Sequence, residues 1–167
     1  MLNQLHRVIL RPGIGQKMIL LVLASIIFTH VLLSQGLPKS LTAFLNRNYK
    51  GWKLAGECYP EEKENKRILV GDFDGNGKRD YAVKFVRGKK GFLMAFLANG
   101  PKWKPFYLHI WDDPNEARYS DLMMFDPGDS WEMGGSPKFK YETPADFRCE
   151  SDVGGPHTYR NGKFIAY

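Results

Sequence analysis

The sequence has few of the residues that carry catalysis and metal chemistry in small proteins, because it contains only two cysteines and four histidines among 167 residues. No histidine lies near either cysteine in the sequence, which disfavours a Cys/His metal site. His109 and His157, the two histidines beyond residue 36, lack metal-ligand spacing, and no serine stands in a nucleophile elbow. These absences predict a chain that is not an enzyme.

Long hydrophobic runs are also scarce. The main apolar stretch, residues 18–33, is shorter than the roughly 17 residues that a membrane-spanning helix needs at minimum. It follows a basic, acid-free segment and precedes the small residues Ser34 and Gly36, a pattern typical of export signals. We therefore predict that residues 1–36 are a signal peptide cleaved after Gly36, with an uncleaved N-terminal membrane anchor as the alternative. In both cases residues 37–167 are expected to be extracytoplasmic, periplasmic or secreted, and to meet a membrane only through this segment.

The net positive charge of the chain is small once the leader is set aside. The whole chain has a net charge of +6, and the leader supplies three of its basic residues and none of its acids. The remaining 21 basic and 18 acidic residues leave a net charge of +3. This charge is a matter of solubility, and it does not predict a nucleic-acid partner.

The two cysteines, Cys58 and Cys149, both lie beyond the leader. An even number in an oxidising compartment predicts one disulfide, and two separate buried thiols are the alternative. A disulfide across this long loop is worth about 4–5 kcal/mol in the chain-entropy model.

The pattern of residues 37–167 predicts a single β-rich domain. A short helix is expected from Pro38 to Tyr49, because proline suits a first helical turn and Leu41, Phe44 and Leu45 then share one face. Asn161-Gly162 is typical of a type I′ hairpin turn. Strands are predicted at 52–55, 67–70, 81–87, 92–98, 104–111, 122–125, 139–141, 146–149, 157–160 and 163–167. The fold class is therefore mainly β, an antiparallel meander forming a compact sheet or a partly closed barrel.

The acidic loop 72–80 is the most informative segment. Asp72, Asp74 and Asn76 occupy its positions 1, 3 and 5, and Asp80 occupies position 9. Alternate residues of a tight loop point inward, so their oxygens can surround one ion, and a glycine at position 6 permits a sharp reversal. Calcium takes six to eight oxygen ligands, so this pattern predicts a Ca²⁺ site. A polar hairpin turn without metal is the alternative.

The segment 71–83 resembles the calcium-binding core of FG-GAP and VCBS repeats, which are β-propeller blades of secreted and cell-surface adhesion proteins. It differs from an EF-hand, because Val83 stands where that motif places a bidentate glutamate. The chain carries one copy, whereas a propeller needs about 4–8 blades, so the resemblance implies the loop and not the propeller. The resemblance implies that the side-chain ligands are Asp72, Asp74, Asn76 and Asp80. It implies that Lys78 contributes its backbone carbonyl.

Two aromatic residues in loops, Trp131 and Tyr119, are the predicted binding surface. The resulting hypothesis is an exported binding or interaction module with structural calcium and a protein or carbohydrate ligand. A periplasmic enzyme inhibitor or accessory protein is the alternative. A small hydrolase is a third reading, and it requires a deep cleft in which two acids, or His157 and an acid, converge.

Overall fold

The computed structural model describes residues 36–60, 67–132, 137–151 and 153–167. These residues belong to one unit that runs from Gly36 to Tyr167. The predicted leader, apart from Gly36, lies outside the described residues. Among the residues that are described, no helix has the length and hydropathy needed to cross a bilayer.

The first sheet has five antiparallel strands built around the pair β3–β4. The order is β1-β3-β4-β5, and β2 also pairs with β3. β2 pairs with the first half of β3 and β1 with its second half, so these two short strands share one edge. The strands are β1 (Lys53–Leu54), β2 (Ile68–Gly71), β3 (Asp80–Arg87), β4 (Lys90–Asn99) and β5 (Lys102–Trp111).

The second sheet is a four-stranded antiparallel meander in the order β6-β7-β8-β9. A short 3-10 helix, η2 (Glu116–Tyr119), connects β5 to it. The last hairpin turns at Asn161 and Gly162, whose φ angles of 52° and 82° confirm the positive φ values of the predicted type I′ turn. The strands are β6 (Ser120–Phe125), β7 (Thr143–Arg148), β8 (Gly154–Arg160) and β9 (Lys163–Ala166).

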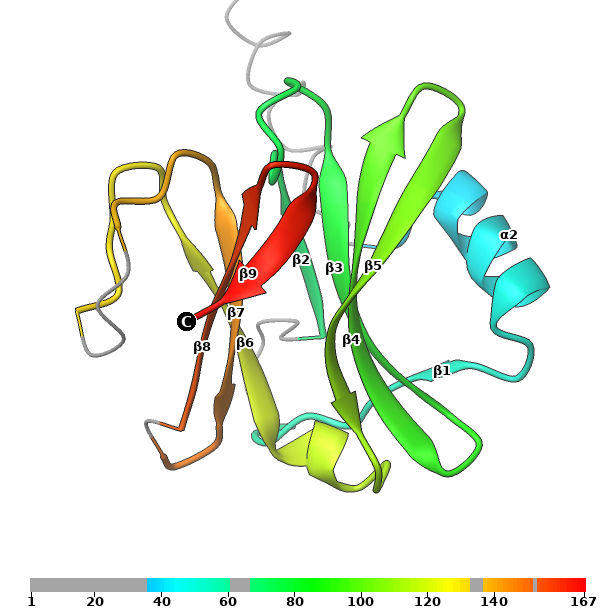
Figure 1. Ribbon diagram of the computed structural model, residues 1–167. Coiled ribbons are helices and arrows are strands. Elements are labelled where there is room, and N and C mark those ends of the chain that lie inside the picture. The colour runs from blue at the N-terminus through cyan, green and yellow to red at the C-terminus, as the bar shows by residue number, and fades with distance from the viewer. Residues whose placement is uncertain (1–35, 61–66, 133–136, 152) are drawn as a thin grey trace, which may run out of the picture. The chain divides into compact units, whose positions relative to one another are not determined.

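The core has two layers, one on each face of the first sheet. Tyr81, Val83 and Phe85 of β3 pack with helix α2 (Lys39–Asn48), whose Leu41 and Leu45 are fully buried. The alternate residues of β3 and β4 pack toward the second sheet. Figure 1 shows α2 and the β6–β9 sheet on opposite sides of the first sheet. β4 is therefore covered on both faces.

A β-bulge in β5 changes which of its side chains face the second sheet. The register with β4 shifts between Leu93, which pairs with His109, and Met94, which pairs with Tyr107. Leu108 is the extra residue, so His109 and Tyr107 lie on opposite faces of the sheet. His109 therefore faces the second sheet together with Trp111, on which its ring stacks at a centroid distance of 4.4 Å.

The mainly β class with a single short helix is confirmed, and the sheets do not close into a barrel within the described residues. One predicted strand is absent, and several strand boundaries are wrong, among them the starts of β7 and β8. Residues 139–141 form no strand, and β7 starts at Thr143, earlier than predicted. Phe139 instead packs its ring on Phe125 of the second sheet, with the ring centroids 5.3 Å apart. Its side chain covers the sheet, although its backbone does not pair with a strand.

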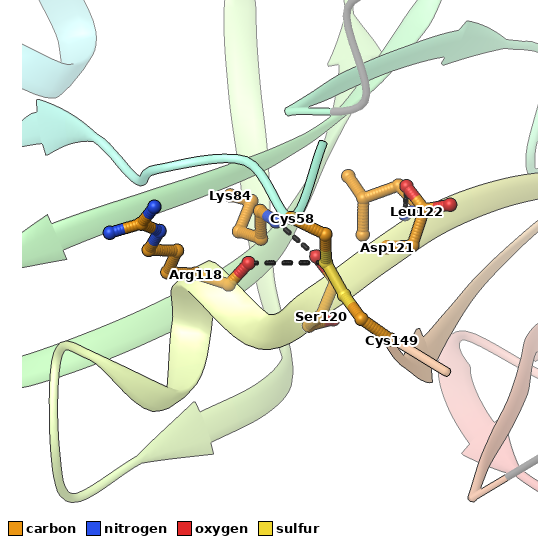
Figure 2. Close-up of a disulfide and its surroundings, with 7 residues drawn as sticks. All are labelled: Cys58, Lys84, Arg118, Ser120, Asp121, Leu122 and Cys149. Atoms are coloured by element: carbon orange, nitrogen blue, oxygen red, sulfur yellow. Dashed lines mark hydrogen bonds between the residues drawn. A yellow bond between two sulfur atoms is a disulfide. The ribbon is translucent and has the colours of Figure 1, made fainter. Parts of the chain in front are cut away.

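The predicted disulfide between Cys58 and Cys149 is confirmed, with Cα atoms 6.3 Å apart and a sequence separation of 91. Figure 2 shows this bond beside η2 and the start of β6. The Cys149 backbone N–H donates a hydrogen bond to the carbonyl of Tyr119 at 2.8 Å, and this hydrogen bond connects the end of β7 to η2. A disulfide of this kind is typical of an oxidising, extracellular environment.

Candidate functional site

The acidic loop connects β2 to β3, whose last pair is Gly71 with Asp80. Phe73, the second residue of the loop, is buried in the core between the sheets. Its side chain therefore anchors the loop in the interior, while residues 75–79 are exposed. Phe73 and Asp80, which are both buried, fix the two ends of this exposed stretch. The oxygens of the loop are therefore held in a small volume.

Three of the predicted ligands come together in this loop. Carboxylate oxygens of Asp72, Asp74 and Asp80 all lie within 4.8 Å of one another. Asp80 is fully buried, and its two oxygens accept hydrogen bonds from the N–H of Phe73 at 2.9 Å and of Ala98 at 2.7 Å. Each oxygen keeps a second lone pair, so these hydrogen bonds orient Asp80 without preventing it from binding a cation.

Backbone amides of the loop hold the other two carboxylates. Asp72 accepts hydrogen bonds from the N–H of Asn76 at 3.0 Å and of Gly77 at 2.8 Å. Asp74 accepts a longer one from Asn76 at 3.2 Å. The side-chain oxygen of Asn76 in turn accepts from the N–H of Lys78 at 2.8 Å. The chain thus wraps around its own acidic groups, as a loop prepared for a cation requires.

The negative charges of the loop favour the binding of a cation. Burial raises the pKa of Asp80, the hydrogen bonds from Ala98 and Phe73 lower it, and the charges of Asp74 and Asp72 raise it, with a net pKa of about 6. The ionised carboxylate is therefore disfavoured where it lies. A divalent cation among these three groups would remove that penalty, because its positive charge would offset the charge of the buried carboxylate.

Two further residues, Tyr141 and Glu142, lie beside this loop, although both directly precede β7 of the second sheet. Glu142 accepts a hydrogen bond from the N–H of Asp72 at 2.5 Å, so a fourth carboxylate lies against the site. The ring of Tyr141 lies against Gly75. No local pattern could identify either residue, because their position depends on how the two sheets pack.

The two loop glycines provide a matched test of this packing. Gly75 and Gly77 both have φ of +74°, but a methyl group on Gly75 would meet Tyr141 at 2.0 Å, whereas one on Gly77 would meet nothing within 4 Å. We expect Gly77→Ala to cost about 1 kcal/mol from backbone strain alone, and Gly75→Ala at least about 2 kcal/mol, because strain and overlap add. Urea unfolding of both variants measures this. Equal losses would contradict the Tyr141 contact.

The two predicted binding residues lie in different surroundings. Tyr119, in η2, is 56% exposed. Trp131 is half-buried, with its ring 4.9 Å from that of Phe147 and 6.0 Å from that of Phe125. Tyr119 therefore presents the larger free surface, whereas Trp131 packs against the second sheet.

A network of three side chains, far from the acidic loop in the sequence, is the main feature that the sequence analysis missed. Asp146 of β7 accepts hydrogen bonds on one oxygen from His109 Nδ1 at 3.0 Å and on the other from His157 Nε2 at 2.6 Å. Burial alone would raise the pKa of Asp146, but the hydrogen bonds from both histidines outweigh it and lower the pKa to about 2. The same bond to Asp146 raises the pKa of His109.

This network supplies the pairing of His157 with an acid that the hydrolase reading requires. Ser120 lines the pocket that contains His109 and Asp146, and its hydroxyl makes no hydrogen bond within the described residues. Among the described residues, Ser120 is therefore not hydrogen-bonded to either histidine of the network. The arrangement orients an imidazole, which suits binding as well as proton transfer.

Comparison with known proteins adds no relative, since no family model, curated protein or solved structure matches the chain. The resemblance of the loop to FG-GAP and VCBS repeats therefore rests on its own residues.

Proposed function

We propose that this chain is an extracytoplasmic binding module in which one calcium ion, held by the loop between β2 and β3, fixes the edge of the first sheet. The observation that carries the proposal is the convergence of three carboxylates from one short loop within 4.8 Å. The ligands would be Asp72, Asp74, Asn76 and Asp80 through their side chains and Lys78 through its carbonyl.

The surroundings of the three carboxylates support calcium over a smaller ion. All the donors are oxygens, which suits a hard cation, and the loop offers more than four of them in an irregular arrangement. Mg²⁺ demands a nearly ideal octahedron and retains its water, so a loop of this kind fits it less well. With three carboxylates and one amide, we propose a dissociation constant of about 10⁻⁵–10⁻³ M, which matches extracellular calcium levels.

The proposed location follows from the same considerations. Residues 1–36 would direct export or provide a membrane anchor through 18–33, and the disulfide would then form outside the cytoplasm. The proposed partner is a protein or a carbohydrate, and the exposed ring of Tyr119 supports a contact near η2. The proposed role is binding, without a catalytic step.

Calcium binding predicts a specific gain in thermal stability. At a calcium concentration about 100 times the dissociation constant, the ion should add about 2.7 kcal/mol, which raises the melting temperature on the order of 10 °C. The measurement is thermal melting of the full chain followed by circular dichroism, in calcium, in magnesium and in chelator.

The matched variants are Asp74→Ala and Asp126→Ala, which remove the same charge from two different loops. Asp126 is exposed and lies outside the acidic loop, so its variant should keep the response to calcium. Asp74→Ala should lose it. Identical melting of the wild type in calcium and in chelator would overturn the proposed calcium site.

A further inference from the structure

A pocket of about 250 Å³ lies at the edge of the two sheets on the side of η2. Its walls come from the end of β5, from η2, and from the strands β6 and β7. We call it the His109 pocket, and the residues that matter to the argument are His109, Glu116, Tyr119, Ser120, Asp146 and Arg148. None of them belongs to the acidic loop.

Hydrogen bonds fix the back wall of the pocket. The side chain of Asp146 is 7% exposed, and each of its oxygens already accepts a hydrogen bond from a histidine. One of these bonds occupies His109 Nδ1, so Nε2 is the nitrogen of that ring that a ligand can use. The negative charge of Asp146 is compensated within the wall, and the pocket therefore offers few acceptors at its buried end.

Ser120 provides the clearest indication that something binds here. It is 4% exposed, and its hydroxyl is buried without a hydrogen-bond partner among the described residues. A buried polar group left unpaired costs about 1–3 kcal/mol, so a water or a ligand that pairs with this hydroxyl would be stabilised. The pocket beside it gives that partner a place.

A buried positive charge lies directly behind Ser120. Lys84 is fully buried in β3, and its ammonium donates a hydrogen bond to the carbonyl of Ser120, as Figure 2 shows. Burial lowers the pKa of Lys84 to about 8, although the charges of Asp121, Glu57 and Asp146 act to raise it. The ammonium is thus still mostly protonated at neutral pH, and it makes the potential at Ser120 more positive.

The free groups of the pocket are mainly donors. The guanidinium of Arg148 has no ion pair in the described part of the chain, and the hydroxyl of Ser120 can donate. His109 can donate from Nε2 when it is protonated. Glu116, which is exposed in η2, is the single carboxylate of the lining with uncommitted oxygens.

We propose that the His109 pocket binds the oxyanion group of a small ligand, either a carboxylate or a phosphate, through Ser120, Arg148 and protonated His109. The guanidinium of arginine offers a fork of donors that suits an oxyanion, and the serine hydroxyl can rotate to donate to the same group. The exposed ring of Tyr119 would then contact the rest of the ligand. This inference gives the proposed binding module its ligand class, and it rests on that half of the proposed function and not on calcium.

The proposal implies weaker binding at higher pH. The charged and titratable groups around His109 are Asp146 and Arg148 of β7, His157 of β8, Glu116 of η2 and Lys84 of β3. Asp146 favours the protonated form of His109, and an anion at Nε2 would favour it further. The affinity should therefore be highest below the pKa of His109 and fall as the pH rises through it.

The test is a titration of the full chain with inorganic phosphate and, separately, with acetate, followed by the NMR signals of the histidine rings. We expect saturable shifts at His109 with at least one probe, which then assigns the source of the oxyanion. Arg148→Gln should weaken the binding roughly 10-fold or more and Ser120→Ala about fivefold, because each removes one hydrogen bond to a charged group. Glu116→Gln should strengthen it, since a repelling charge is removed.

The control variant is Arg160→Gln, which removes the same charge from an exposed position at the β8–β9 turn and should not change the affinity. Thermal melting of each variant establishes that it is folded. The proposal is overturned if neither probe gives a saturable shift at His109, if Arg148→Gln and Arg160→Gln weaken binding equally, or if Glu116→Gln weakens it. Titration in calcium and in chelator separates this result from the loop, because a failed calcium response with intact anion binding refutes only the calcium site.

Discussion

Replacing both cysteines, as Cys58→Ser with Cys149→Ser, is expected to lower the free energy of unfolding by about 4–5 kcal/mol. The disulfide closes a loop of 91 residues, and without it the unfolded chain regains the corresponding conformational freedom. This loss is a large fraction of the stability of a small domain, so part of the population should unfold at physiological temperature.

Guanidinium unfolding of the full chain measures this difference. The wild type treated with reductant is the control, since it should match the double variant, and Cys58→Ser alone should match both. A double variant as stable as the oxidised wild type would show that the bond does not constrain the unfolded chain.

Replacing Asp146 with asparagine is expected to cost about 3 kcal/mol of stability at neutral pH. One oxygen of the amide can still accept a hydrogen bond from a histidine, but its NH₂ group cannot, so one of two imidazoles loses its partner in a buried site. Asp112→Asn is the control, because the side chain of Asp112 is 92% exposed and its ion pair with Lys90 contributes little.

The pH dependence provides a second measurement of the same group. The pKa of Asp146 is about 2 in the folded protein, below the ordinary value of 3.8, so its ionised form stabilises the fold. This contribution is complete above pH 3.8 and is lost as the pH falls toward 2. The wild type should therefore lose more stability than Asp146→Asn over this acidic range. Equal losses would mean that Asp146 is not stabilised by the two histidines.

Local patterns were sufficient for much of the fold. The proline and the apolar spacing predicted the helix, and Asn161-Gly162 predicted the last hairpin turn, because both signals depend on residues within one element. The cysteine pair followed from its count and compartment. The acidic loop was recognisable because all of its proposed ligands lie within nine consecutive positions, which places their oxygens together whatever the rest of the chain does.

The histidine network could not be predicted, for a specific reason. Strict alternation along β5 would place His109 on the face of Tyr107, whereas the bulge at Leu108 turns it toward β7 and β8. A bulge of this kind leaves no clear sign in the sequence. The pairing of His109 with Asp146 also crosses between two sheets, so it depends on tertiary packing that no local periodicity encodes.

The anchoring of the acidic loop has a consequence for how quickly it could respond to its surroundings. Phe73 is buried between the sheets. The carboxylate of Asp80 accepts hydrogen bonds from the backbone N–H groups of Phe73, in the same loop, and of Ala98, near the end of β4. The packing of the core therefore already holds this segment in place. If the loop binds an ion as proposed, association would demand little rearrangement, and the loop would act as a rigid site and not as a sensor that changes shape.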